Sequence, residues 1–431
     1  MKIGKNEQMG KFVSVSEKKI HKYDSEHSEN FVPCEINDDI HKSIIDSDSN
    51  GDFPGNVTDE GNLQRSSNLN FSGSPAFKLD NSGRRRTEYT LDIDTLSKSS
   101  KKDGKNSDNH LMDTLRNEEE YNSLLIEEFH AEGFKLRSRG KFKDAIKKYS
   151  KVIQMEPTHF KSLFNRGFAY DKIDMIELAI ADYSEAIKVE PKNSFAYYNR
   201  GILYDKLNFL NEAMHDFDRA IEFKKDNADF YHNRGFCLRK MNEYDRAILD
   251  FSQAIEIDAD HSKAIFNRAV CLEYSGRIKE AIYDYTRVLT LNAYHVNSLI
   301  GRGNCFRSIE DYSKAIENYS AVLSINPVQN LALSQRGFCL RKMHQYLDAI
   351  TDYTKVLSLD PLNMRGYNNR AYCYAKLNRF RDAIDDYTTV IKLDSYNSHA
   401  YHNRGVSYDK LGLYEDAISD FKKVLELDSA T

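Results

Sequence analysis

The chain has 431 residues, and its 61 Lys and Arg residues nearly balance 66 Asp and Glu residues, for a formal net charge of −5. This balance argues against a global electrostatic attraction to nucleic acid. The first residues lack the apolar core of a signal peptide, Gly4 is misplaced for myristoylation, and no stretch is apolar for long enough to span a membrane. We therefore expect a soluble, cytoplasmic protein.

Residues 1–108 are rich in Ser, Asn, Asp, Lys and Gly, with only scattered apolar residues. Such a segment cannot bury enough apolar surface to offset its ordering entropy, which predicts a disordered N-terminal arm that leaves Cys34 exposed. The cluster Arg84-Arg85-Arg86-Thr87 is interpreted as solvated charge, with a phosphorylation site or weak anion-binding patch as the alternative. From Leu111 onward, apolar residues at helical spacing predict a lead-in helix over 109–125.

One pattern organises the remaining residues. The tripeptide Asn165-Arg166-Gly167 returns, with substitutions, every 34 residues and without an insertion. The repeats are counted from residues 126, 160, 194, 228, 262, 296, 330, 364 and 398, so that this Gly or Ala stands at position 8. A fixed period of this length is typical of architectures in which each repeat is one supersecondary unit.

Each repeat contains two apolar patterns of helical period, which predicts a pair of helices. The turns between them carry Gly140, Asn208, Asn242, Gly276, Asn378 and Gly412. Second helices are expected to end before Pro157, Pro191, Pro327 and Pro361. Position 20 is Ala in every repeat, so positions 8 and 20 predict a close approach of the two helices. An aromatic residue at position 24 is expected to fill the space toward the next unit.

The unit resembles the tetratricopeptide repeat, with Gly or Ala at position 8, Tyr, Leu or Phe at 11, Ala at 20, Tyr or Phe at 24 and frequent Pro at 32. It departs from the family pattern at position 4, which lacks Trp, and at position 7, where Arg replaces Leu. The resemblance covers residues 126–431 as nine tandem repeats. It implies an all-α fold, an α-solenoid in which helix-turn-helix units form a right-handed superhelix behind the disordered arm.

Charges and cysteines at fixed positions have structural interpretations. Position 7 is Arg where position 23 is Asp in seven repeats, and the first repeat exchanges the charges as Glu132 and Lys148. An exchange inside one unit predicts that positions 7 and 23 of the same repeat touch. The cysteines Cys237, Cys271, Cys305, Cys339 and Cys373 stand one repeat apart, which does not bring metal ligands together and predicts small buried residues instead.

The resemblance also implies that first helices line an inner, concave groove with positions 2, 5, 6, 9, 12 and 13. Position 6 carries a ladder of asparagines, Asn165, Asn199, Asn233, Asn267, Asn369 and Asn403. An amide offers donors and an acceptor, so the ladder suits the backbone of an extended peptide; bonding to a neighbouring helix is the open alternative. Flanking aromatic and basic residues complete the predicted peptide-binding site: Phe164, Phe168, Tyr198, Phe236, Arg239, Arg307 and Arg341.

We expect a non-catalytic scaffold or adaptor that binds an extended peptide or partner protein, without a cofactor or metal and without nucleic acid or membrane as a partner. No nucleophile, base and orienting group converge by spacing. A regulatory or substrate-selecting subunit of a separate enzyme is one alternative. A chaperone co-factor is another, although position 5 is never Lys or Arg and position 6 is never basic, so its carboxylate clamp is absent.

The ninth repeat keeps the apolar pattern of the internal ones, with Tyr414, Ile418, Phe421 and Leu425, up to the end of the sequence at Thr431. Solenoid ends are normally covered by a polar face or a capping helix. This face is therefore expected to associate, either with a second copy of the chain or with a partner.

Overall fold

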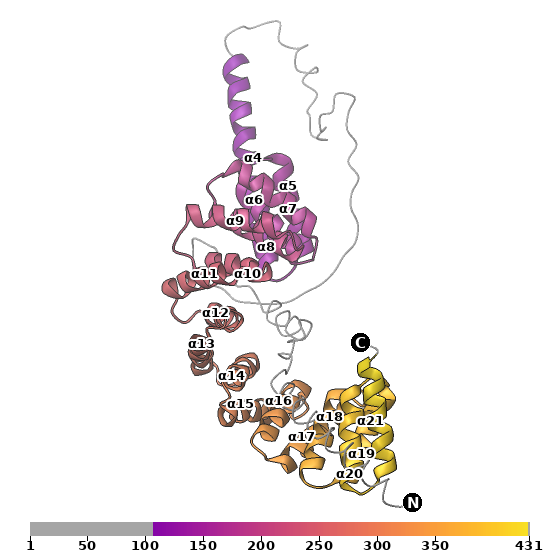
Figure 1. Cartoon of the computed structure of the whole chain (residues 1–431). Coiled ribbons are helices and arrows are strands. Elements are labelled where there is room, and N and C mark those ends of the chain that lie inside the picture. Colours follow the sequence, from indigo (N-terminus) through magenta and orange to yellow (C-terminus); the bar gives the residue numbers. More distant parts are fainter. Residues whose placement is uncertain (1–106, 430–431) are drawn as a thin grey trace, which may run out of the picture. The chain divides into compact units, whose positions relative to one another are not determined.

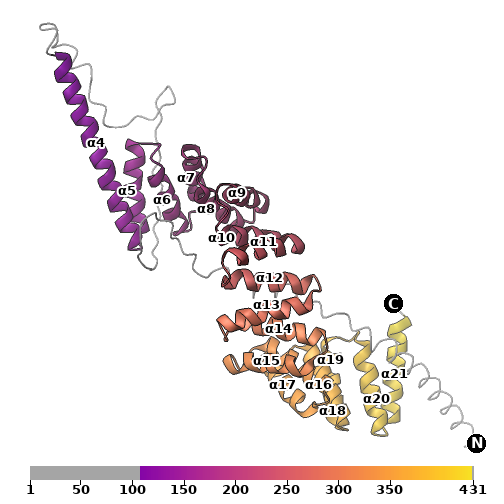
Figure 2. The same ribbon diagram turned by 90° about the vertical axis from the view of Figure 1, so that its left-hand side faces the viewer.

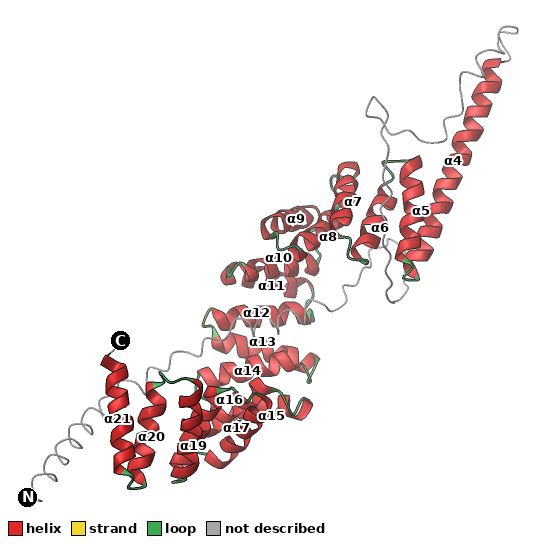
Figure 3. Ribbon diagram, turned by 90° about the vertical axis from the view of Figure 1, so that its right-hand side faces the viewer, coloured by secondary structure: helices red, strands yellow, loops and turns green. Residues whose placement is uncertain are grey.

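The computed structural model describes residues 107–429, with side chains from residue 118 onward. These residues lie in one of two units of the chain, Gly61–Thr431. They form eighteen helices and, within this range, no strand, which confirms the all-α prediction (Figures 1 and 3). The predicted disordered arm, with Cys34 and the Arg84–Arg86 cluster, lies outside the described residues.

The helices form nine consecutive pairs. The first helices are α4 (Ser107–Ser138), α6 (Phe160–Asp171), α8 (Ser194–Lys206), α10 (Ala228–Lys240), α12 (Ser262–Tyr274), α14 (Val296–Ser308), α16 (Asn330–Lys342), α18 (Met364–Lys376) and α20 (Ser398–Lys410). The second helices are α5 (Phe142–Met155), α7 (Ile176–Val189), α9 (Leu210–Phe223), α11 (Tyr244–Ile257), α13 (Ile278–Leu291), α15 (Tyr312–Ile325), α17 (Tyr346–Leu359), α19 (Phe380–Leu393) and α21 (Tyr414–Ser429). The predicted lead-in helix and the first helix of repeat one are continuous in α4.

Both ends of the first helices have a local chemical cause. The residue before most of them, at position 34, accepts a hydrogen bond from a backbone N–H of the first turn, as Asn193 does from Ala196 at 3.1 Å. At the other end, position 15 adopts a left-handed backbone in all nine repeats, with φ between 59° and 73°. The turn at Asn208 is closed by a backbone hydrogen bond, in which Phe209 N–H donates to Tyr204 O at 2.9 Å.

The predicted prolines stand where the second helices end. Pro157 follows the C-cap residue Glu156 of α5, and Pro191, Pro327 and Pro361 hold the same place after α7, α15 and α17. Proline cannot donate the backbone hydrogen bond that another turn would need, so the sequence correctly marks these ends.

The small residues at positions 8 and 20 are buried, as predicted, but the aromatic at position 24 does more than face the next unit. A Cβ built on Gly303 would lie 2.8 Å from the Tyr319 ring, and one on Gly201 would lie 2.9 Å from the Phe217 ring. In the repeats with glycine at position 8, the ring at position 24 therefore packs on that glycine of its own first helix. Our expectation that it serves mainly the next repeat was incomplete, because a glycine leaves room for an aromatic ring directly beneath its Cα.

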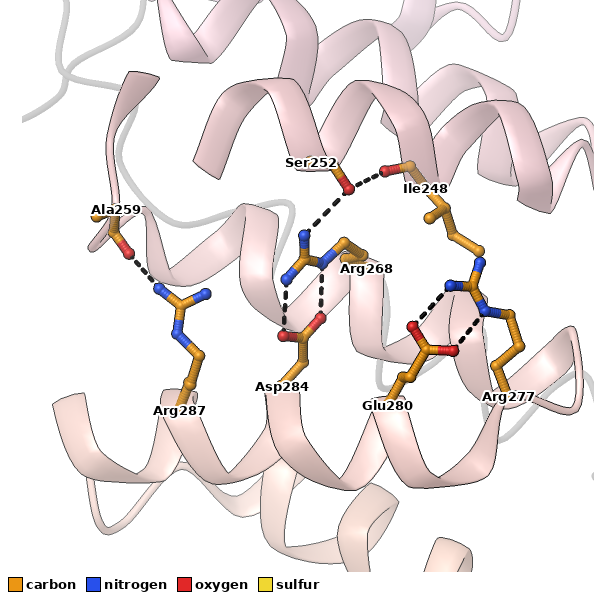
Figure 4. Close-up of polar contacts among 8 residues, drawn as sticks. All are labelled: Ile248, Ser252, Ala259, Arg268, Arg277, Glu280, Asp284 and Arg287. Atoms are coloured by element: carbon orange, nitrogen blue, oxygen red, sulfur yellow. Dashed lines mark hydrogen bonds and ion pairs between the residues drawn. The ribbon is translucent and has the colours of Figure 1, made fainter. Parts of the chain in front are cut away.

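The predicted contact between positions 7 and 23 is confirmed. Arg268 Nε and Nη2 donate to the two carboxylate oxygens of Asp284 at 2.7 and 2.8 Å (Figure 4). The exchanged pair of Lys148 and Glu132 is also formed. The sequence did not predict the third bond, from Arg268 Nη1 to Ser252 Oγ at 3.0 Å in the preceding repeat. Each such arginine thus joins its own second helix to the preceding one.

Burial makes this ion pair costly to break. Asp284 is 1% exposed. In repeat two, burial raises the pKa of Asp182, and the Arg166 guanidinium only partly offsets the increase. A buried carboxylate of this kind depends on its arginine, because removing one partner leaves an uncompensated charge.

Candidate functional site

The first helices lie side by side along the array. Each helix packs on the next one in the chain, and first helices of neighbouring repeats also contact each other, as α6 and α8 do and as α10 and α12 do. Figure 2 shows this succession of helices. We call the surface formed by positions 2, 5, 6, 9, 12 and 13 of α4, α6, α8, α10, α12, α14, α16, α18 and α20 the first-helix face.

The asparagine ladder divides into two groups. Three members bond to position 5 of the preceding repeat: Asn233 Nδ2 donates to Tyr198 Oη at 3.0 Å, and Asn165 and Asn267 lie 3.4 and 3.0 Å from ring nitrogens of His130 and His232. The other members, Asn199, Asn369 and Asn403, are half-buried, and their amides make no hydrogen bond within residues 107–429.

The ladder is broken at position 301 for a steric reason. Repeat six has Gly301 where most repeats have Asn. A Cβ at this position would lie 2.4 Å from Cζ and 2.6 Å from Oη of Tyr285. Because the Tyr285 hydroxyl occupies this space, where it donates to Glu273 Oε2 at 2.7 Å, no side chain fits there without movement.

The predicted aromatic residues are half-buried between helices. Phe164 meets the Tyr183 ring edge-on at a centroid distance of 5.4 Å, and the Tyr198 ring lies 4.8 Å from that of Phe230. These two rings therefore contribute to packing between helices as well as to the first-helix face.

The position 9 rings carry cations. The guanidinium carbon of Arg137 lies 5.0 Å from the ring centroid of Phe168, and that of Arg239 lies 4.7 Å from the centroid of Phe236. Cations at this distance from a ring face are attracted by its quadrupole. The two rings and their cations thus form paired units along the first-helix face.

The three predicted arginines of position 12 differ in exposure. Arg239 is 6% exposed, and its Nη1 donates to Asn267 Oδ1 at 2.5 Å, so this guanidinium belongs to the packing between repeats. Burial lowers the pKa of Arg239. Arg307 and Arg341 are only half-buried and lie within reach of a ligand on the first-helix face.

Two features of the surface were missed in the sequence. Position 12 pairs with position 13 of the next repeat where the charges allow it, as Asp171 does with Lys206 at 2.6 Å and Asp205 with Lys240 at 2.8 Å. Position 33 is apolar and 61–80% exposed in repeats five to eight, which carry Tyr294, Val328, Leu362 and Tyr396. Aligning the repeats position by position would have revealed both patterns.

The pKa values of buried titratable groups on and beside this face are shifted by their surroundings. Burial raises the pKa of Glu273 to about 7, against the hydrogen bond from Tyr285 and the positive charge of Arg307. Burial lowers the pKa of His232 to about 3. Burial also raises the pKa of the Cys271, Cys339 and Cys373 thiols to about 12, and it raises those of Cys237 and Cys305. All five thiols are free and buried, as predicted.

The last helix also has an apolar surface. Tyr414, Ile418 and Leu425 of α21 are exposed, whereas Ile248 and Ile350, at the same repeat position as Ile418, are buried. Association through this surface stays a prediction.

Comparison with known proteins agrees with this geometry. Two family models, each described as a tetratricopeptide repeat, match residues 160–193, 196–227, 228–261, 365–397 and 398–430. The matched segments fall on the helix pairs, and the same geometry continues through the segments between them. The chain contains a tandem array of tetratricopeptide repeats. Its described helix pairs are tetratricopeptide repeats that form an α-solenoid. Among residues 107–429, no helix is both long and apolar enough to cross a membrane.

Several solved structures are similar to part of this chain. YrrB, described as a TPR protein with an unusual peptide-binding site, is 24% identical, with a TM-score of 0.40 over 43% of this chain and 95% of YrrB. MamA from Desulfovibrio magneticus RS-1 is 20% identical, with a TM-score of 0.39 over 39% of this chain and 96% of its own. A tetratricopeptide repeat protein from Parabacteroides merdae ATCC 43184 is 17% identical, with a TM-score of 0.43 over 58% of this chain and 99% of its own. No curated protein gives a significant match.

Proposed function

We propose that this protein is a non-catalytic scaffold that binds an extended segment of a partner protein along the first-helix face. Tetratricopeptide repeats generally support protein interactions. The observation that carries the proposal is the division of the asparagine ladder. Asn199, Asn369 and Asn403 keep both amide donors and the acceptor free of bonds to other described residues while remaining half-buried on the face.

These free amides suit the backbone of an extended chain. A peptide in extended conformation presents N–H and C=O groups in alternation, and one amide can donate to and accept from such a backbone. Asn369 and Asn403 stand at the same position of neighbouring repeats, on α18 and α20, which contact each other. A chain that crosses both helices could therefore use both amides without regard to its side chains.

We also propose that the chain itself carries out no reaction. In residues 107–429, no group of three or more His, Cys, Asp or Glu side chains could hold a metal ion. The repeat cysteines are buried, and their raised pKa values keep them as thiols at neutral pH, although the thiolate is the nucleophilic form. Catalytic turnover by the purified chain would contradict this part of the proposal.

The test compares two triple variants of the full chain as bait for partners, with quantitative mass spectrometry as the readout. Asn199→Ala, Asn369→Ala and Asn403→Ala together should lose the partners retained by wild type while the melting temperature stays nearly unchanged. Asn165→Ala, Asn233→Ala and Asn267→Ala together remove amides that bond between repeats, so this variant should lose stability. Full retention of all partners by the first variant would contradict the proposed site.

A further inference from the structure

The charge pattern of positions 12 and 13 changes along the first-helix face. In repeats two and three, position 12 is acidic and pairs with a lysine one repeat later, as Asp171 does with Lys206 and Asp205 does with Lys240. In repeats six to eight the same two positions hold two cations, Arg307 with Lys342 and Arg341 with Lys376. Within repeats six to eight, the ion pair between repeats is thus replaced twice by a pair of like charges.

Within repeats six to eight, no acidic side chain of this face offsets the excess charge. Repeats six, seven and eight together carry five cations and no Asp or Glu at the positions of the face: Arg307, Arg341, Lys342, Arg365 and Lys376. In the part of the chain that the structure describes, Arg307 and Arg341 have no carboxylate within ion-pair distance, whereas Arg336 on α16 has Asp352 at 2.8 Å. The Nε atoms of Arg307 and Arg341 are buried and have no hydrogen-bond partner.

Aromatic rings hold these cations together. The guanidinium carbons of Arg307 and Arg341 lie 5.6 and 5.2 Å from the ring centroid of Phe338. Arg341 also lies 5.0 Å from the centroid of Tyr372, and Lys376 Nζ lies 5.2 Å from the same ring. Because each ring contacts more than one cation, the positive charges of α14, α16 and α18 form one continuous patch.

We propose that the first-helix face of repeats six to eight selects partner segments rich in Asp and Glu. This inference rests on the proposed function and names the chemistry of its ligand. Guanidinium groups bind carboxylates through two parallel hydrogen bonds, and Arg307 and Arg341 have donors for which the described chain supplies no carboxylate. An acidic segment would also remove the repulsion between Arg307 and Lys342 and between Arg341 and Lys376.

The same geometry disfavours nucleic acid as the ligand. Single-stranded nucleic acids bind basic grooves chiefly when exposed aromatic rings are free to stack on the bases. Phe338 and Tyr372 are half-buried and already carry guanidinium or ammonium groups. A segment with carboxylates needs no free ring.

The test measures fluorescence anisotropy of a labelled, C-terminally amidated peptide of alternating Asp and Ser with the full chain. Amidation removes the terminal carboxylate, so only side chains supply charge. The peptide should bind, a matched Asn-Ser peptide should not, and added salt should weaken binding. Arg307→Gln with Arg341→Gln should reduce the affinity about tenfold. Should that variant misfold by circular dichroism, Lys342→Gln with Lys376→Gln, at two exposed positions, should still weaken binding.

The control removes the same charge elsewhere on the face. Lys161→Gln on α6 with Lys172→Gln at its C-cap should leave the affinity unchanged. Equal losses in both double variants, equal binding of the Asn-Ser peptide, or tighter binding of a thymidine oligonucleotide of the same length would overturn the proposal. None of these results depends on Asn199, Asn369 and Asn403, so the proposed scaffold function would stand or fall separately.

Discussion

Arg302 donates from Nε to the amide oxygen of Asn318 at 2.9 Å, in the place where seven other repeats join an Arg to an Asp. The Asn318 amide nitrogen turns away and donates to Lys314 O at 2.7 Å. Arg302 thus lacks the second hydrogen bond and the negative charge that Arg268 receives from Asp284. Burial lowers the pKa of Arg302. The contact between positions 7 and 23 is therefore weaker in repeat six than in the repeats that join an Arg to an Asp.

The first prediction concerns this contact. Asn318→Asp should restore the bidentate pair and raise the free energy of unfolding by about 1 kcal/mol. Asp284→Asn in repeat five is the mirror-image control and should lower it by a similar amount. Urea unfolding of both variants provides the measurement, and a less stable Asn318→Asp variant would contradict the interpretation.

The second prediction concerns the gap in the asparagine ladder. Gly301→Asn would complete the ladder in sequence but place a side chain against Tyr285. We expect a loss of about 1–3 kcal/mol in stability from overpacking. Gly301→Asn combined with Tyr285→Leu should lower the free energy of unfolding by less than the sum of the two single losses, because the Tyr285 ring no longer obstructs the new side chain. Additive losses in the double-mutant cycle would argue against the steric explanation.

The third prediction uses the left-handed turns. Glu310 has φ 63°, a backbone conformation that disfavours side chains, whereas Gly276 has φ 73° with no atom near its missing Cβ. Glu310→Gly should stabilise repeat six and Gly276→Ala should destabilise repeat five, each by about 1 kcal/mol, for reasons of backbone strain alone. In thermal unfolding, Glu310→Gly should raise the melting temperature and Gly276→Ala should lower it. Shifts of the melting temperature in the same direction would refute the explanation.

The fourth prediction concerns pH. Burial raises the pKa of Glu273 to about 7 from an ordinary value of 4.5. A raised carboxyl pKa contributes stability that is fully present below pH 4.5 and is lost as the pH rises to about 7. Glu273→Gln should therefore stabilise the protein relative to wild type at pH 8 more than at pH 4.5, by up to about 3 kcal/mol.

His232 has the opposite effect in wild type. Its lowered pKa of about 3 removes stability as the pH falls below 6.5, so the Glu273 contribution must be measured as the difference between wild type and Glu273→Gln. A difference that does not change between pH 4.5 and pH 8 would contradict the shifted pKa of Glu273.

The repeat period and its small residues were sufficient to predict the fold. Ala145 and its equivalents recur once in every 34 residues with a Gly or Ala at position 8, and Glu132 with Lys148 indicated a contact between helices through a charge exchange. These features depend on local spacing, which one sequence displays.

The candidate site could be predicted only in part, because burial depends on neighbouring repeats. Arg239 and Arg307 occupy the same repeat position, but Asn267 and Phe236 enclose the first, whereas the second stays half-exposed. The left-handed turns at Asp174, Glu310 and His344 also lack the Gly or Asn that marks their equivalents. The solenoid geometry, and not the residue type, imposes that backbone.

Photo-crosslinking can distinguish partner binding along the first-helix face from binding along the second helices. Benzoylphenylalanine placed at Asn199 or Asn369 reports on the first-helix face, while the exposed Leu249 and Tyr283 of α11 and α13 report on the second helices. We expect partners captured by the full chain to crosslink from Asn199 and Asn369 and not from Leu249 or Tyr283. Crosslinks confined to Leu249 and Tyr283 would contradict this expectation.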